Sequence, residues 1–383
     1  MFRLDAFYLE QRRESSVWTS VRSILLALII TAIVSVMVML AMSDQPAEAI
    51  WQLLTFPWQG RRMEVQLGLV AQQAAYLATI AIGLSVGFRA NVWNIGAEGQ
   101  FALGSIGAYC GYLLLGSPQS LLTLPLILLA GMIGGCLWAM IPAVLRVKYN
   151  TNELLTSLML VYVGSHLLTY LCIGPWKGDP KAGQAETYPI ASSVRPTDII
   201  SGTELHYGLI ILFAAFLLLA VVLMFTLLGY RLRVAQFTPR AERFAGFSPN
   251  NTVWLSFIIS GAFAGLAGAV YMTAETGKLI QAENYLENFG FAAIVIAFLG
   301  RLHPVGILLA ALLISYVNVG ASYIQASLRV DDSVADLIEV VALFSFLGTA
   351  MLDQYRVRWN RRSANAARQP SGIETQDLKT ERS

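Results

Sequence analysis

The sequence predicts an all-α, polytopic integral membrane protein with about ten transmembrane helices, some of them broken or re-entrant. Of the 383 residues, 56% are hydrophobic and only 13% are charged, whereas soluble domains carry about a quarter charged residues. Several uncharged apolar runs reach the length of about 20 residues that a helix needs to cross a bilayer. Arginine and lysine collect at alternate ends of these runs, as they do in cytoplasmic loops. The same composition argues against a soluble catalytic domain.

The N-terminal region predicts a retained first span. Residues 1–22 contain four arginines mixed with acidic residues and are expected to lie in the cytoplasm. The run 23–43 has no charge and exceeds the apolar core of a cleaved signal peptide, which is about 7–15 residues long. Residues 44–64 contain two tryptophans and predict an amphipathic helix at the outer interface of the membrane. The transmembrane domain is therefore expected to cover residues 23–352.

The remaining spans follow from the apolar runs. The longest hydrophilic stretch between them, residues 177–205, contains three prolines and is expected to be an external loop. Residues 353–383 form a basic tail that is expected to be cytoplasmic and disordered. The spans after the first are expected at about 66–87, from the polar segment 88–101 to residue 115, and then at 121–145, 154–176, 206–228, 252–274, 289–300, 304–324 and 335–352.

Two of these runs differ from a plain membrane helix. Phe289–Gly300 is apolar for only 12 residues, which is too short for an ordinary span. A tilted, broken or re-entrant helix is expected there. The run 252–274 carries Gly261, Gly265 and Gly268, and small residues at this spacing allow helices to pack closely in lipid.

A polar segment interrupts the apolar runs between Phe88 and Phe101. The residues before it, 65–87, and those after it, Gly99–Leu145, carry no charge. Polar groups near hydrocarbon are costly unless paired or hydrated, and polar, glycine-containing breaks line the solute path in membrane transporters. The alternative is a helix cap satisfied by the backbone, with the aromatic side chains packed inside the protein. The candidate residues for a solute path are Asn91, Trp93, Asn94, Glu98, Gln100 and Phe101.

Residues 229–251 form the most basic loop between spans. They hold four arginines, so the loop is expected to be cytoplasmic. Pro239 suits the first turn of a helix and Gly246 suits its end. Residues 240–245 therefore predict a short helix lying across the membrane face. Positive-inside topology alone is the alternative explanation for the arginines.

Neither a metal site nor a nucleotide site is expected in this chain. The three cysteines and three histidines are scattered without ligand spacing. The sequence has no Gly-x4-Gly-Lys-Ser/Thr segment, the loop with which many ATPases hold phosphate. The chain is therefore expected to be non-catalytic and to carry no cofactor, and its net charge of +2 does not indicate a nucleic acid partner.

Four segments, in this order, resemble a known family. Asn94–Gln100, Asn-Ile-Gly-Ala-Glu-Gly-Gln, is similar to the signature of ABC-transporter permeases for nucleosides and simple sugars. These permeases belong to the wider branched-chain amino acid/ribose permease family. Asn152–Leu160, Gly229–Gly246 and Phe291–Gly306 resemble further segments of that family.

The resemblance implies the permease subunit of an importer in the bacterial inner membrane, with both termini cytoplasmic. It implies an ABC ATPase that binds ATP, a second and different permease chain, and an extracytoplasmic solute-binding lipoprotein, in contact with membrane lipid. A nucleoside is the first expected solute and a ribose-like sugar is the second. The basic loop is expected to dock on the ATPase, with coupling residues Arg231, Arg233, Pro239, Arg240, Ala241, Glu242, Arg243, Ala245 and Gly246.

Two other classes of protein stay open. An ion-coupled secondary transporter would use intramembrane acids such as Glu98 or Glu339, and uptake driven by an ion gradient without ATP would favour it. A membrane scaffold without transport would have no need of the polar segment. The chain also departs from the resembled family at Gln236–Thr238, where that family often has Gly-Glu-Asn, and at Val161, where it often has asparagine. The second departure leaves the identity of the solute open.

Overall fold

The computed structural model divides into two units, residues 1–30 with 345–383 and residues 31–344, and each is described by itself. The structure describes residues 46–59 and 63–328, except 117–119, 121, 180–182, 201 and 204. Elsewhere it describes three short strands, helical residues 29–34, and scattered helical positions within 22–40 and 337–349. The first and last expected spans, 23–43 and 335–352, lie mostly outside the described residues.

The smaller unit contains an antiparallel sheet that an all-α fold does not include. Strand β2 (Phe7–Gln11) pairs with β1 (Arg3–Leu4) and with β3 (Tyr355–Trp359), and Leu9 lies opposite Val357. Residues 355–359 of the basic tail thus form a strand, and disorder of the tail stays a prediction. Aromatic and β-branched residues alternate with arginine in β3, which favours a strand.

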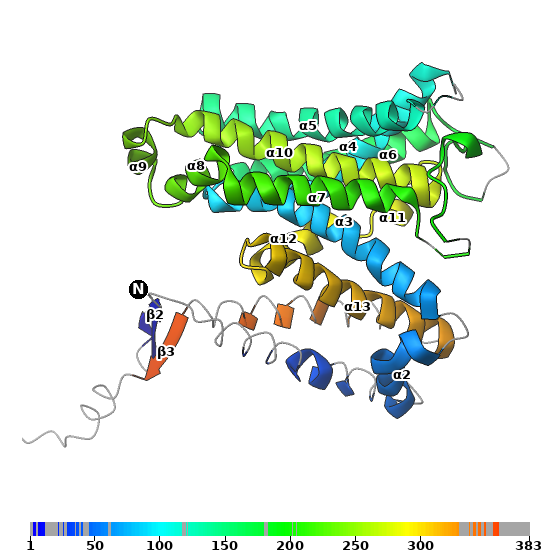
Figure 1. The fold of residues 1–383 in the computed structure, drawn as a ribbon, viewed down its shortest axis with the longest axis horizontal. Coiled ribbons are helices and arrows are strands. Elements are labelled where there is room, and N and C mark those ends of the chain that lie inside the picture. The colour runs from blue at the N-terminus through cyan, green and yellow to red at the C-terminus, as the bar shows by residue number, and fades with distance from the viewer. Residues whose placement is uncertain are drawn as a thin grey trace, which may run out of the picture. The chain divides into compact units, whose positions relative to one another are not determined.

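The larger unit is helical, which confirms the prediction of an all-α, multi-pass membrane protein for this part of the chain (Figure 1). Its elements are α2 (Pro46–Gln59), α3 (Met63–Arg89), α4 (Ala97–Leu115), α5 (Thr123–Tyr149), α6 (Glu153–Ile173), η1 (Ser192–Val194), α7 (Tyr207–Phe225), α8 (Leu227–Ala235), α9 (Pro239–Phe244), α10 (Pro249–Val270), η2 (Tyr271–Thr276), α11 (Ala282–Tyr285), α12 (Phe289–Leu299) and α13 (Pro304–Leu328).

The expected number of about ten spans is not supported. Among the described residues, six helices are long and apolar enough to cross a membrane: α3, α5, α6, α7, α10 with η2, and α13. Helix α4 has 19 residues, but Glu98 and Gln100 lie in its first turns. Helix α12 has only 11 residues, so it is about 16 Å long, roughly half of a hydrocarbon core about 30 Å thick. It is a half-length helix, as a broken or re-entrant segment requires.

Helix α2 is amphipathic, as the tryptophan-rich segment predicts. Trp51 and Trp58 are 63% and 64% exposed, whereas Phe56 is fully buried. The Phe56 ring lies 4.9 Å from the ring of Tyr316 on α13, centroid to centroid. One face of α2 therefore packs on α13, and its position at the outer membrane interface stays a prediction.

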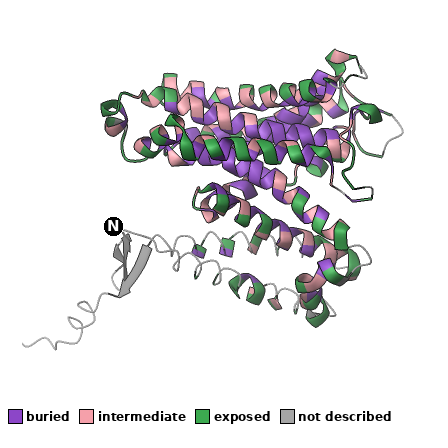
Figure 2. Ribbon diagram, viewed as in Figure 1, coloured by how far each residue is buried: buried purple, intermediate pink, exposed green. Residues whose placement is uncertain are grey.

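Glycines bring α4, α5 and α10 into close contact. A Cβ atom at Gly265 of α10 would lie 2.5 Å from the carbonyl oxygen of Gly131 and 2.9 Å from Cα of Gly135, both on α5. Gly104 of α4 approaches Gly265 at least as closely. Figure 2 shows buried residues running along the middle of this helix stack. The expected close packing of small residues is confirmed, and such packing is a main source of attraction between helices in lipid.

The long loops lie at opposite ends of the helices. Helices α8 and α9 lie at one end in Figure 1, and α11 lies at the other. Glu186, in the long loop expected to be external, forms an antiparallel bridge with Ile280, close to α11. The loops 177–205 and 229–251 are thus separated by the length of the helices, which agrees with their predicted positions on opposite sides of a membrane.

Candidate functional site

The basic loop folds into two short helices, α8 and α9. Thr238 is the N-cap of α9, because its Oγ1 accepts a hydrogen bond of 3.0 Å from the backbone amide of Ala241. Pro239 occupies the first turn. Gly246 follows with a φ angle of +81°, a left-handed conformation that glycine adopts without strain. The predicted short helix is confirmed, with its ends shifted by one residue.

Glu242 attaches α9 to the helices behind it. Its side chain is buried, lies 3.6 Å from Nε of Arg231 on α8, and accepts a hydrogen bond from Oγ1 of Thr252 on α10. Arg231 also donates to the carbonyl oxygen of Ser248 at 2.8 Å. Removing one partner of a buried ion pair is strongly destabilising, because the other charge is left without compensation. Glu242 and Arg231 therefore hold α9 in place and do not form its outer surface.

The outer surface of α9 carries aromatic and basic side chains. Phe244 is 94% exposed, and Phe237, just before the helix, is 73% exposed. Arg240 and Arg243 are exposed as well. Aromatic and arginine side chains are enriched in protein interfaces. The sequence prediction omitted Phe244, although an aromatic residue at the end of an arginine-rich helix was a visible signal. Of the other predicted coupling residues, Arg233, Ala245 and Gly246 are exposed and Ala241 is half-buried.

A cavity of about 340 Å³ lies behind the basic loop. Residues of three separate segments line it: 90–92 after α3, 146–153 around the turn between α5 and α6, and 235–253 of the basic loop. Asn91 and Glu242 are both among the lining residues. The polar segment and the residue that attaches α9, Glu242, therefore border the same cavity.

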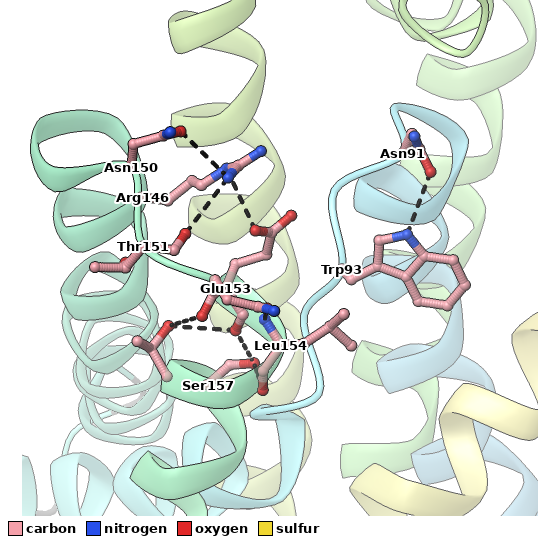
Figure 3. A network of polar contacts seen from close by, with 10 residues as sticks. Asn91, Trp93, Arg146, Asn150, Thr151, Glu153, Leu154 and Ser157 are labelled. Carbon is pink, nitrogen blue, oxygen red and sulfur yellow. Dashed lines mark hydrogen bonds and ion pairs between the residues drawn. The ribbon is translucent and has the colours of Figure 1, made fainter.

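Polar contacts stabilise the turn between α5 and α6 (Figure 3), and a hydrogen bond joins the start of α6 to the polar segment. Arg146 pairs with Glu153 at 3.3 Å and donates to Oδ1 of Asn150 at 3.4 Å. Ser157, one turn into α6, accepts a hydrogen bond of 3.1 Å from the backbone amide of Ile95. Because Glu153 is both paired and buried, it acts here as part of this contact and not as a free intramembrane acid.

Asn94 and Gln100 form a closed, buried network. Their side-chain amides exchange hydrogen bonds of 2.9 and 3.0 Å. Asn94 also donates to Oγ of Ser260 at 2.7 Å and accepts from the backbone amide of Gly96 at 2.9 Å. Both side chains are at most 2% exposed. In this conformation the polar groups of Asn94 and Gln100 are therefore satisfied within the protein, as the alternative interpretation expects. A role in the solute path stays a prediction for both residues.

Glu98 joins α4 to the half-length helix α12. Its buried carboxylate accepts a hydrogen bond of 2.5 Å from the backbone amide of Gly290, in the first turn of α12. A Cβ atom at Gly290 would lie 2.7 Å from Cα of Glu98, so only glycine allows this approach. The unpaired amides and the dipole of a helix N-terminus stabilise a carboxylate. Glu98 thus caps α12.

The two aromatic residues predicted for the solute path pack against other rings. The Trp93 ring lies 5.4 Å from that of Phe298, and its Nε1 donates to Oδ1 of Asn91 at 3.2 Å (Figure 3). Phe101 is fully buried, with its ring centroid 5.8 Å from that of Phe289. Asn91 is exposed at the loop end. In this conformation the rings of Trp93 and Phe101 therefore pack within the protein, and their place in a solute path stays a prediction.

Replacing Asn94 with leucine is expected to destabilise the folded protein. The change removes four hydrogen bonds and leaves polar groups of Gln100 and Ser260 with fewer partners, at a cost of about 1–3 kcal/mol for each buried group left unsatisfied. Thermal unfolding of the detergent-solubilised protein should show a lower midpoint. Asn284→Leu, at an exposed position on α11, is the control. Equal midpoints for the two variants would contradict a stabilising role of the network.

A second cavity, of about 390 Å³, lies between α3, η2, α12 and α13, away from the basic loop. None of the residues predicted for a solute path is among its lining residues. The missed signal was the presence of three glutamines in an otherwise apolar, charge-free run of α3. The polar and aromatic lining residues are Gln66, Gln72, Gln73, Tyr76, Tyr271, Glu275, Glu287, Phe289, Ser322 and Tyr323.

Comparisons with known proteins match most of the chain. The family model for the permease component of branched-chain amino acid transport systems matches residues 67–352. This range begins in α3 and includes the polar segment and the basic loop.

Three curated relatives are similar to this chain. A glucose ABC transporter permease protein of Haloferax volcanii is 29% identical over 377 residues, which are 95% of this chain and 97% of the relative. A nucleoside ABC transporter permease protein of Lactococcus lactis is 30% identical over 262 residues, 67% of this chain and 72% of the relative. A guanosine ABC transporter permease protein of Bacillus subtilis is 28% identical over 291 residues, 75% of this chain and 83% of the relative.

Proposed function

Because the chain belongs to the family of permease components of branched-chain amino acid transport systems, we propose that it is the membrane-spanning subunit of an ABC importer for a small polar solute. A nucleoside is the proposed solute, since two of the three relatives are named for nucleosides or guanosine. A sugar is the second candidate, since the third relative is a glucose permease. The proposed location is the inner membrane, with both termini in the cytoplasm.

The observation that carries this proposal is the construction of α9. Glu242 holds the helix from behind through buried contacts, and Phe244 is left exposed beside arginines. The chain has no phosphate-binding loop of its own, so ATP binding and hydrolysis are assigned to a partner ATPase that docks on this surface. A second permease chain and an extracytoplasmic solute-binding lipoprotein complete the proposed complex. Neither a resident cofactor nor a nucleic acid is required.

The contacts around the 340 Å³ cavity supply a route for the motion. Movement of α9 is passed to α8 and α10 through Arg231 and Thr252. The same cavity is lined by the turn between α5 and α6, which is bonded to the polar segment at Ile95. Rigid-body rocking of helix groups against one another would then open the path on alternate sides of the membrane.

Transport by the reconstituted complex tests the proposal. The permease is placed in proteoliposomes with its proposed ATPase, second permease and binding protein, and uptake of radiolabelled guanosine is measured with ATP in the lumen. Uptake is expected with ATP and not with a non-hydrolysable analogue. Uptake driven by a proton or sodium gradient without ATP would instead support the ion-coupled transporter, with Glu98 as a candidate acid.

Phe244→Ala is expected to reduce ATP-driven uptake about tenfold, because truncation of a central aromatic residue in an interface often costs 1–2 kcal/mol or more. The yield and thermal stability of the permease should not change, since the ring has almost no contacts within the chain. Co-purification of the ATPase provides the second measurement. Phe213→Ala, at a 47% exposed position on α7, is the matched control. Normal uptake and co-purification by the Phe244 variant would remove α9 as the docking element.

A further inference from the structure

The 390 Å³ cavity has the size and wall composition of a small-molecule site. Such sites have volumes of about 300–1,000 Å³ and combine apolar or aromatic walls with a few polar groups. Gln66 and Tyr76 of α3, Tyr271 and Glu275 of η2, and Tyr323 of α13 are among its lining residues. Elements far apart in the sequence therefore converge on one space.

One wall consists of three packed aromatic rings. Tyr76 and Phe289 lie nearly parallel, with an interplanar angle of 21° and a centroid distance of 5.9 Å. Tyr271 meets them edge-on, at 5.7 Å from Tyr76 and 5.8 Å from Phe289. Phe101 packs on Tyr271 at 5.5 Å. The three rings are at most 5% exposed, so they form a rigid aromatic wall with a small accessible area that a planar ring can contact.

Hydrogen-bond acceptors complete the lining. The carboxylate of Glu287 accepts a hydrogen bond of 2.8 Å from the hydroxyl of Tyr271, and that of Glu275 accepts one from the side-chain amide of Gln72. Both glutamates are exposed. The Oε1 atom of Gln73 is buried and has no hydrogen-bond partner in the described part of the chain. Buried acceptors are normally satisfied, so a donor such as a solute hydroxyl or amino group fits here.

Backbone irregularities bring the two carboxylates to this space. Glu275 lies on η2, a π-helical segment that directly follows α10, and such segments often occur at functional sites. Glu287 precedes Asn288, whose φ angle of +58° is a left-handed conformation tolerated by asparagine. The next turn is held by the hydrogen bond between Gly290 and Glu98. The hydrogen bond from Gly290 to Glu98 therefore helps to fix the start of α12, directly after Glu287.

The acidic residues in the cavity lining favour a neutral solute over a phosphorylated one. Two carboxylates line the cavity, and the described lining residues include no lysine, arginine or histidine. A phosphate group carries about −1.5 to −2 charge at neutral pH, and nearby carboxylates repel it, although water around these exposed side chains weakens the repulsion. Solute hydroxyls, in contrast, would form charge-assisted hydrogen bonds with the carboxylates.

We propose that this cavity is a solute subsite of the permease that takes a neutral nucleoside and rejects its phosphorylated form. The base stacks on the wall of Tyr76, Tyr271 and Phe289, and the hydroxyls of the sugar donate to Glu287 and Glu275. The assignment rests on the proposed transport function and adds to it the class of solute and the residues that recognise it.

Equilibrium binding to the purified permease–ATPase complex, without the solute-binding protein, tests the subsite. The probe is tritiated guanosine, and the competitors are unlabelled guanosine and guanosine monophosphate. Guanosine is expected to bind, with the monophosphate at least about tenfold weaker. Glu287→Gln should weaken guanosine binding about tenfold, as the loss of a charged hydrogen-bond partner does. It should also reduce the difference in affinity between guanosine and guanosine monophosphate.

A second variant tests the same space without removing a polar group. Ala326→Trp adds bulk at an exposed position in the cavity wall and should abolish guanosine binding. This variant tests the subsite if Glu287→Gln does not fold. Glu283→Gln, exposed on α11 and outside the lining, is the control and should bind normally.

The outcomes separate the subsite from the transport function. The subsite is overturned if the wild-type complex transports guanosine with ATP but does not bind it, if the monophosphate competes as well as guanosine, or if Ala326→Trp binds normally. Absence of ATP-driven uptake of both guanosine and glucose by the complete wild-type complex would overturn the proposed function itself.

Discussion

Glu242→Lys is expected to abolish ATP-driven uptake while the protein is still inserted in the membrane. The substitution replaces a buried carboxylate that lies 3.6 Å from Nε of Arg231 with a second cation beside that guanidinium, and it removes the acceptor for Thr252. Breaking a buried pair costs about 3–5 kcal/mol, which is enough to detach α9 from α8 and α10. The measurements are uptake in proteoliposomes and the yield of monodisperse permease from membranes.

Two further variants separate the effect of the charge change from the effect of its position. Glu242→Gln keeps a hydrogen-bond acceptor for Thr252 and should retain part of the uptake, whereas Glu283→Lys, exposed on α11 at the other end of the helices, should retain all of it. If Glu242→Lys transports at the wild-type rate, the ion pair does not hold the docking helix in its working position.

Gly265→Leu is expected to prevent the helices of the larger unit from packing. Its Cβ atom alone would lie 2.5 Å from the carbonyl oxygen of Gly131 and 2.9 Å from Cα of Gly135, so α10 and α5 must separate. Overpacking of a core commonly costs about 1–3 kcal/mol and sometimes more, and here backbone atoms, which cannot turn aside, are the obstacle. The folded fraction after detergent extraction, measured by size-exclusion chromatography, should fall sharply.

Gly183→Leu provides the matched control. A Cβ atom at Gly183 would meet no atom of the described residues within 4 Å, so this variant should elute as the wild-type protein does. A monodisperse Gly265→Leu protein with unchanged thermal stability would mean that the contact between α5 and α10 is not needed for the fold.

Hydrophobicity and spacing were sufficient to predict most individual helices. The amphipathic α2, the half-length α12, the short α9 and the close packing around Gly265 were all predicted from local sequence, because each depends on the composition or period of a single segment. The number of spans was overestimated among the described residues. Run length alone cannot distinguish a full crossing from a half-length helix that enters through an extended segment.

The hydrogen-bond and ion-pair partners of polar side chains could not be predicted from local sequence in the same way. Asn94 and Glu287 are both polar residues beside apolar runs, yet Asn94 is closed in a network with Gln100 and Ser260, whereas Glu287 lines a cavity. Glu242 was expected on the docking surface, but the structure buries it against Arg231. Whether a polar group is satisfied depends on residues more than a hundred positions away in the chain, as with Asn94 and Ser260.

The sequence by itself determined the class of the protein and its membrane character, because burial in lipid depends on composition. It also predicts a cytoplasmic side for the basic loop, from its arginines. It also contained the segments by which the family can be recognised. Only the tertiary structure decided which face of α9 is free and which polar side chains point into a cavity. The first property arises where α9 meets α8 and α10, and the second where α3, η2, α12 and α13 meet. Hydrogen bonds between distant segments are set by packing and not by local pattern.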